Sequence, residues 1–171
     1  LMVLGFYLNA QNESLIKEIK AKIILTKDNH VLFNLLNELG WEYRFAYPDS
    51  TIFYCSQALA LGNRLALKKD LSRPLNYIGV AHDKKGEPIN AYEKYREAFN
   101  LAEQQLDSNQ IAYADNNIGR LLSDQGVHAK ALDHFFKAQK IFEAVKDTSG
   151  LAYVFQSIGR IHSSQHDFKN A

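Results

Sequence analysis

The sequence predicts an all-α fold in which helical hairpins stack into a solenoid. A glycine recurs at intervals of 39, 40 and 40 residues, at Gly40, Gly79, Gly119 and Gly159, each time inside a stretch with helical periodicity. Glycine in a helix interior costs about 1 kcal/mol relative to alanine, so its recurrence indicates a place where two helices approach too closely for a side chain. A fixed period near 40 residues is typical of helical repeats that bury a continuous core by stacking.

The first 27 residues divide into an apolar run and a polar segment. Residues 1–10, LMVLGFYLNA, are uncharged and end at Ala10, and the chain then turns polar at QNESLIKEIK. This change resembles the tail of a secretory signal peptide cleaved after Ala10; the alternative is a first packing strand or helix. The run is too short for a transmembrane span. Residues 11–27 predict a leading helix, and Asp28 or Asn29 caps the helix that follows.

Four repeat units follow, at about residues 28–66, 67–106, 107–146 and a shorter 147–171. Each predicts a glycine-bearing first helix, a turn and a second helix; the second helices run near 50–64, 88–105 and 128–145. Gly86 and Gly126 suit the left-handed position just beyond a helix end. Pro88 suits the first turn of a second helix, and Asp49 or Ser50 is expected to cap its counterpart in the first unit.

The first helix of the second unit is expected to differ from the others because it contains Pro74. Proline lacks a backbone N–H and clashes with the preceding turn, so this helix should start late or kink. The next two units begin at residues that favour the N-cap position, namely Asp107 or Ser108 and Asp147 or Thr148.

Other residues keep a fixed distance from the glycine. Alanine follows by 12 residues, an aromatic by 16 and alanine by 19, at Ala91, Tyr95 and Ala98, then Ala131, Phe135 and Ala138. The first unit matches with one residue fewer in its turn, at Thr51, Cys55 and Ala58. This pattern resembles the tetratricopeptide repeat (TPR) family, in a 40-residue variant with longer helices. The resemblance covers about residues 28–171 and implies a right-handed superhelix of antiparallel helical hairpins.

A narrower resemblance lies in residues 35–62, LLNELGWEYRFAYPDSTIFYCSQALALG. This segment is similar to the opening repeat of exported TPR segments in Bacteroidetes-type sensor histidine kinases and related regulators. In such proteins a signal peptide and a TPR array precede a membrane helix and a cytoplasmic signalling domain. The resemblance implies an exported, periplasmic location for this segment; the alternative is a cytoplasmic one.

One stripe of each first helix is the candidate ligand site. The positions six and three residues before the glycine, and one and four after it, lie along one helix face. In a TPR stack this face lines the concave groove. The candidate ligand-binding residues are Asn34, Asn37, Trp41, Arg44, Arg73, Asn76, Asp83, Tyr113, Asn116, Arg120, Tyr153, Gln156 and Arg160, and the stripe also contains Val80, Ser123 and Ser163.

The stripe carries one side-chain amide per repeat, at Asn37, Asn76, Asn116 and Gln156. An amide offers both a donor and an acceptor, so it can pair with the backbone of an extended peptide without reading its sequence. Arg120 and Arg160 are expected to clamp a carboxylate or phosphate, with tyrosines as flat packing surfaces. The alternative is a solvated polar face.

Other classes of function find little support in the sequence. A net charge of +1 provides no basic block for nucleic acid. Cys55 is the single cysteine, and its spacing predicts a small buried hydrophobe. His162 and His166 lie four residues apart but lack the glutamate of a zinc-peptidase motif, so no metal site is expected. We expect no catalytic residue and no cofactor in this segment; the parent protein's enzymatic status stays open.

These observations favour a protein- or peptide-binding module that serves as the sensing or interaction region of a larger signalling protein of the two-component sensor kinase type. Two alternatives stay open: an architectural scaffold that self-associates, and an intracellular receptor for a signalling peptide. Direct membrane insertion by this segment is not expected. The last unit is cut short, so Ile158, Ile161 and Phe168 are expected at an exposed end that frays or self-associates.

Overall fold

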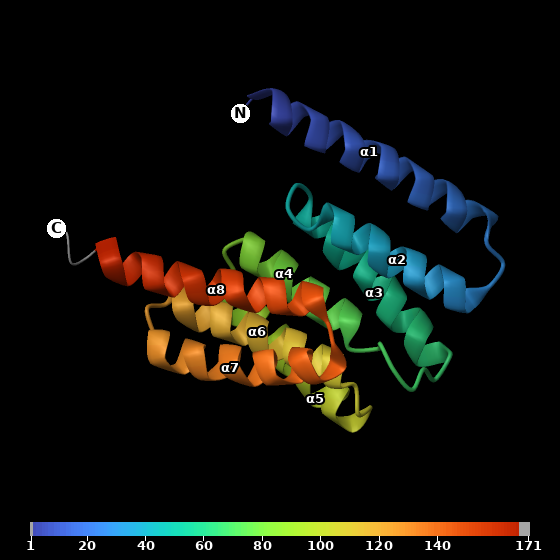
Figure 1. The fold of residues 1–171 in the computed structure, drawn as a ribbon. Helices are drawn as coiled ribbons and strands as arrows, with labels where there is room; N and C mark the ends of the chain where they lie inside the picture. The colour runs from blue at the N-terminus through green and yellow to red at the C-terminus, as the bar shows by residue number, and fades with distance from the viewer. Residues whose placement is uncertain (1, 168–171) are drawn as a thin grey trace.

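The structure, a computed structural model, describes residues 2–167, with side chains described for residues 12–163. Every regular element in this part of the chain is a helix, and the order of the helices follows the chain from end to end of the stack (Figure 1). The elements are α1 (Met2–Leu25), α2 (Asn29–Tyr43), α3 (Pro48–Arg64), α4 (Arg73–Lys84), α5 (Pro88–Gln104), α6 (Ser108–Asp124), α7 (His128–Val145) and α8 (Thr148–Asp167). The predicted all-α helical-repeat solenoid is confirmed.

The helices form two layers. Each helix packs against its neighbours in sequence, and in addition α2 contacts α4, α4 contacts α6, and α6 contacts α8. The second helices of the hairpins, α3, α5 and α7, make no such contacts with one another within residues 2–167. The first helices therefore lie closer together than the second helices do. The stack curves, and the first helices form its inner layer.

The recurring glycines lie where the second helix presses a side chain onto the first. A Cβ added at Gly79 would lie 2.4 Å from the ring of Tyr95, and one at Gly119 would lie 2.7 Å from the ring of Phe135. At Gly40 the neighbour is the sulfur of Cys55, at 2.4 Å. These distances are too short for a side chain, so the predicted reason for the glycines is confirmed in three repeats. At Gly159 no described atom lies within 4 Å of an added Cβ.

In the later hairpins the core is built around aromatic rings and alanines. Tyr95, Phe135 and Phe142 are fully buried, and Ala131 and Ala138 pack with Phe135 in one cluster. Cys55 is also fully buried, as predicted, and burial raises the pKa of its thiol to about 12. The small residues allow the helices to approach, and the rings fill the space between the helices.

The turns follow the predicted chemistry in the second and third hairpins. Gly86 and Gly126 both adopt positive φ, at 74° and 78°. Pro88 lies in the first turn of α5, where a backbone N–H is not needed. Asp107 caps α6 by accepting a hydrogen bond from the backbone N–H of Gln110. Asp28 caps α2 in the same way, through the N–H groups of residues 30 and 31.

The first hairpin turn differs from the prediction. The helix α3 begins at Pro48, so neither Asp49 nor Ser50 is its cap, and the cap residue Tyr47 makes no side-chain hydrogen bond. Proline at the first helical position starts the helix earlier than the expected cap. Asp49 instead accepts a hydrogen bond from Lys85 of the next hairpin, at 2.8 Å. Pro74 has its predicted effect, because α4 has 12 residues and its counterpart α6 has 17.

Asp115 lies four residues before Gly119, where the first two units have Leu36 and Leu75, and it is buried as they are. Its carboxylate lies 2.8 Å from Nδ1 of His134 on α7. A buried carboxylate needs such a partner. The carboxylate that replaces an apolar side chain on α6 is therefore paired with a histidine on α7 of the same hairpin.

The amino-terminal segment forms one helix that packs on the first hairpin. The helix α1 is continuous from Met2 to Leu25, across the boundary drawn after Ala10, and its Ile19 packs on Leu35 and Leu39 of α2. Among the described helices, none combines the length and apolar character of a membrane span.

At the other end of the chain, Ile161 was expected at an exposed end, which is wrong: it is 1% exposed and belongs to the cluster around Phe142. Phe168 lies outside the described residues.

The glycine contacts yield a direct test. Gly79→Ala is expected to lower the free energy of unfolding by about 1–3 kcal/mol, because Tyr95 is buried and the ring has little space to move. Gly159→Ala is the matched control at the same register, and alanine there should be neutral or stabilise by up to about 1 kcal/mol. Urea denaturation of both variants measures the difference. Equal losses in the two would contradict the role assigned to the glycines.

Candidate functional site

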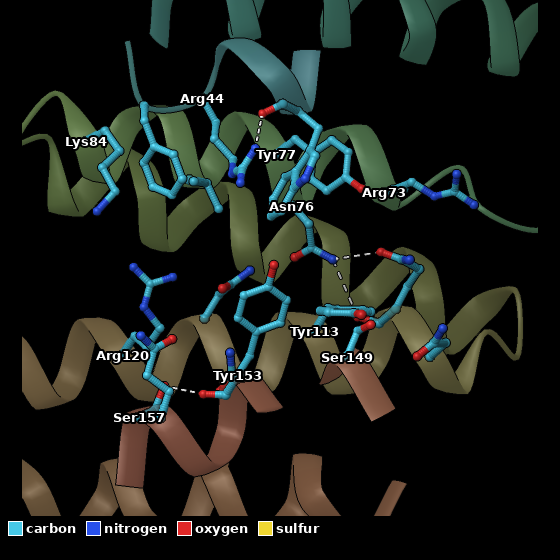
Figure 2. A pocket seen from close by; sticks show the side chains of 18 of the residues that line it. Arg44, Arg73, Asn76, Tyr77, Lys84, Tyr113, Arg120, Ser149, Tyr153 and Ser157 are labelled. Atoms are coloured by element: carbon cyan, nitrogen blue, oxygen red, sulfur yellow. Dashed lines mark hydrogen bonds between the residues drawn. The ribbon is translucent and has the colours of Figure 1, made fainter. Parts of the chain in front are cut away.

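A groove with a volume of about 730 Å³ lies on the inner layer of the stack. Its walls come from all four first helices, α2, α4, α6 and α8, together with the residues that immediately follow or precede them. Figure 2 shows tyrosine, arginine and amide side chains from these helices pointing toward one another across it. The groove is thus built by repetition, since each repeat contributes the same helix face.

Ten of the thirteen candidate residues line this groove. They are Trp41, Arg44, Arg73, Asn76, Tyr113, Asn116, Arg120, Tyr153, Gln156 and Arg160, and Val80 of the same stripe joins them. Their common position in the repeat brings them together although they span four helices. Whether they bind a ligand stays a prediction.

Three candidate residues, Asn34, Asn37 and Asp83, lie outside the lining. Asn34 is exposed, and Asn37 is only 1% exposed. The amide of Asn37 donates a hydrogen bond to the carbonyl of Phe33, at 2.9 Å, within its own helix. The predicted amide series is therefore present in the lining only at the other three positions, Asn76, Asn116 and Gln156. Asp83 is partly buried and binds Arg120 instead of facing the groove.

The groove amides are only partly satisfied. Nδ2 of Asn76 donates to Oε1 of Gln110, at 3.1 Å. The Oδ1 atoms of Asn76, Asn109 and Asn116 are buried and have no hydrogen-bond partner within the described part of the chain. A buried acceptor without a partner costs free energy, so an N–H from a ligand would be favourable at each once the side chain rotates to bring its oxygen into the groove. Gln156, the fourth predicted amide, is exposed.

The two arginines expected to clamp an anion are already paired. Arg120 binds Asp83 at 3.3 Å, and Arg160 binds Asp124 at 2.9 Å. In both pairs the aspartate comes from the preceding repeat, so the ion pairs join neighbouring first helices. Arg73 is paired as well, with Asp70. The clamp stays a prediction, and the structure adds that each arginine already contacts an aspartate, a contact between adjacent repeats that the sequence does not show.

Aromatic rings form the remaining surface. The rings of Trp41 and Tyr77 lie 4.8 Å apart, and those of Tyr113 and Tyr153 lie 6.5 Å apart. Burial raises the pKa of Tyr77 to about 12 and also raises that of Tyr113, so both hydroxyls stay protonated at neutral pH. These rings provide flat contact area and hydrogen-bonding tips.

Sequence reasoning missed a second row of lining residues. Two residues before the glycine, the lining contains Tyr77, Asn117 and Ser157. Five residues after it, the lining contains Phe45 and Lys84. Nine or ten residues before it, near the helix starts, the lining contains Asp70, Asn109, Gln110 and Ser149. Positions seven residues apart return to one helix face. A stripe wider by one residue would have found Tyr77, Asn117 and Ser157. The residues near the helix starts depend on how the turns fold back.

The fold and this groove define the class of the protein: an all-α helical-repeat solenoid with a concave inner surface. No protein-family model matches the chain, and no curated protein matches it. Among solved structures, it is similar in fold to a Rap protein complexed with Competence and Sporulation Factor, with a TM-score of 0.79 and 20% identity. The match covers 98% of this chain and 48% of that chain, so this chain spans about half the length of the Rap protein.

A second solved structure is similar over a smaller part. BtubC (BKLC) from P. vanneervenii matches with a TM-score of 0.54 and 19% identity, over 90% of this chain and 73% of that chain. Both identities are low, so these likenesses establish the fold alone.

The carboxylate of Asp147 lies behind the groove wall, where it is bound by the lining residues Tyr113 and Asn109. Burial acts to raise the pKa of Asp147, but hydrogen bonds outweigh it and hold the pKa below its usual value. The donors are the backbone N–H groups of Gly150 and Ser149 and the side chains of Tyr113 and Asn109. Because the folded pKa is depressed, this carboxylate stabilises the fold above its unfolded pKa of about 3.9. The stabilisation is lost as the pH falls through the folded pKa.

Tyr113→Phe is expected to raise the pKa of Asp147 toward the usual value, because the hydroxyl donates to its Oδ2 at 3.0 Å. An NMR titration of the carboxyl carbon measures this change. Tyr153→Phe is the matched control, since Tyr153 lies on the same groove but is not among the groups that hold this carboxylate. An unchanged titration in the Tyr113 variant would contradict the assignment.

Proposed function

We propose that this chain is a binding module that holds an extended peptide or protein segment in its groove. The observation that carries the proposal is the set of buried acceptors, above all Oδ1 of Asn76 and Oδ1 of Asn116, which lack partners within the described residues. An extended peptide offers a backbone N–H at every residue except proline. Side-chain amides can accept these groups whatever the peptide sequence.

The spacing of the helices suits such a ligand. Packed helices lie about 8–10 Å apart, and an extended chain rises about 3.3 Å per residue. Amides on adjacent first helices, such as Asn76 on α4 and Asn116 on α6, would then contact peptide residues about three positions apart. The intervening ligand side chains would lie on the rings of Tyr77, Tyr113 and Tyr153.

The likeness to the Rap protein supports this proposal at the level of the fold, since that protein was solved in a complex with Competence and Sporulation Factor. A solenoid of this kind can therefore hold a bound factor. The identity of the ligand of the present chain is a separate matter, which its own groove residues determine.

The proposal is tested by replacing the two acceptors together. Asn76→Ala combined with Asn116→Ala should weaken the binding of a random hexapeptide pool by about tenfold, because two hydrogen bonds of about 0.5–1.5 kcal/mol each are lost. Affinity is measured by capture on the immobilised chain with mass-spectrometric counting. Far-UV circular dichroism and the melting temperature show whether the variant is folded.

Asn34→Ala is the matched control, because Asn34 is exposed on the same helix series and does not line the groove. It should leave peptide capture unchanged. A folded double variant that captures peptides as well as the wild type would contradict the groove proposal. An architectural scaffold predicts that outcome, together with self-association that the groove substitutions do not change.

We further propose that the module is the sensing or interaction region of a larger, exported signalling protein of the two-component type. This part of the proposal rests on the resemblance of residues 35–62 to exported TPR segments and on the apolar run that ends at Ala10. The rival is an intracellular receptor for a signalling peptide.

Export makes a specific prediction about the mature chain. When the parent protein is expressed in its native cells, the amino-terminal residue is expected to be Gln11, because cleavage follows Ala10. Amino-terminal sequencing of the purified protein and its recovery in an osmotic-shock fraction measure this. An amino terminus that retains residues 1–10 in a cytoplasmic fraction would support the intracellular rival.

A further inference from the structure

The side-chain amide of Asn76 is held by a side chain of the next repeat. Its Nδ2 donates to Oε1 of Gln110 at 3.1 Å and, more weakly, to the backbone carbonyl of the same residue at 3.5 Å (Figure 2). Both residues are buried, at 2% and 6% exposure. In this orientation Oδ1 of Asn76 is buried and has no partner within the described residues. The oxygen that would accept a peptide N–H is therefore out of a ligand's reach until the amide rotates.

The position of Gln110 is itself fixed by the cap of its helix. Gln110 lies in the first turn of α6, and its backbone N–H donates to Oδ1 of the N-cap residue Asp107 at 3.1 Å. The other carboxylate oxygen of Asp107 accepts from the backbone N–H of Asp70, also at 3.1 Å. The cap thus ties the start of α6 to the connection between α3 and α4. Rotation of the Asn76 amide therefore breaks its bond to Gln110, because the backbone of Gln110 stays in place.

The register of the repeat shows why the other buried groove amide is not held in this way. Gln110 lies nine residues before the glycine of its unit, and Gly150 has the same position in the following unit, opposite Asn116. Glycine has no side chain, and Asn116 forms no side-chain hydrogen bond within the described part of the chain. Asn116 can therefore rotate without breaking a hydrogen bond, whereas Asn76 cannot.

We propose that Gln110 is a positioning residue that restrains ligand binding, because it holds the Asn76 amide in an orientation that a peptide has to break. Rotation of Asn76 brings its Oδ1 into the groove and gives up the hydrogen bond from its Nδ2. The affinity for a peptide is lowered by the free energy of that bond, and removal of the acceptor on Gln110 raises it. This inference rests on the proposed peptide-binding function and concerns the regulation of the same groove.

Gln110→Met tests the restraint, since methionine keeps the length of the side chain and lacks the amide. We expect the random hexapeptide pool to bind this variant about two- to tenfold more tightly than the wild-type chain. Gln125→Met is the matched control, because Gln125 is exposed at the end of α6 and does not line the groove. It should leave the affinity unchanged. Equal or weaker binding by a folded Gln110→Met variant would overturn the inference.

A double-mutant cycle separates the restraint from a general change in the groove wall. Gln110→Met is combined with Asn76→Ala, a background in which no amide is left to hold. The gain in affinity should disappear there, because the two substitutions act on one hydrogen bond. A gain of the same size in this background would come from the more apolar wall and would contradict the role assigned to Gln110.

The wild-type chain provides a test that does not depend on how well a variant folds. In the ligand-free chain the side-chain amide protons of Asn76 are bonded to Gln110, so they should exchange with solvent more slowly than those of Asn116. Saturation with the hexapeptide pool should shift the Asn76 amide signals in a nitrogen–proton correlation spectrum. Signals that keep their ligand-free positions at saturation would show that the bond is not broken and would refute the inference.

The outcomes separate this inference from the proposed function. Peptide capture that depends on Asn76 and Asn116, combined with an unchanged affinity of Gln110→Met, would overturn the restraint and leave peptide binding intact. Failure of the wild-type chain and of every variant to bind the pool would overturn the proposed function and this inference together.

Discussion

The structure depends on one steric constraint, the close contact between a glycine of the first helix and a side chain of the second. In the second and third hairpins that side chain is an aromatic ring, Tyr95 against Gly79 and Phe135 against Gly119. The ring occupies the space that a Cβ would need, so the contact sets both the distance and the rotation of the two helices. Once the rotation is set, one face of the first helix turns inward in each of the three repeats that have this contact.

The inward faces are joined by contacts between repeats. The first helices contact one another along the stack, whereas the second helices do not do so within residues 2–167. Arg120 reaches Asp83 and Arg160 reaches Asp124, each one repeat back. Of the two pairs, the first is the more buried and therefore the less screened by solvent. Neighbouring helices are thus tied together on the groove side, beside the unsatisfied amides.

Much of the fold and of the groove was predictable from the sequence because the repeat is regular. The period placed the glycines, the turns at Gly86 and Gly126, and the stripe from which most groove residues come. The hydrogen-bond and ion-pair partners of individual polar side chains were not predictable, since these partners lie on neighbouring helices and in other repeats. Asn37 and Asn116 share a register position, yet Asn37 bonds within its own helix and Asn116 faces the groove. The partners of Arg120 and Asp115 lie on other helices, 37 and 19 residues away in the chain.

The unpaired state of Arg44 follows from its position in the series. In the third and fourth units the arginine comes one residue after the glycine and meets an aspartate of the preceding repeat. In the first unit Trp41 occupies that position, and the arginine comes four residues after the glycine. The preceding element is α1, which contains no aspartate, and its Glu18 pairs with Lys22 of the same helix. The regular pairing therefore stops at α2, and Arg44 stacks on the ring of Trp41 instead of meeting an aspartate.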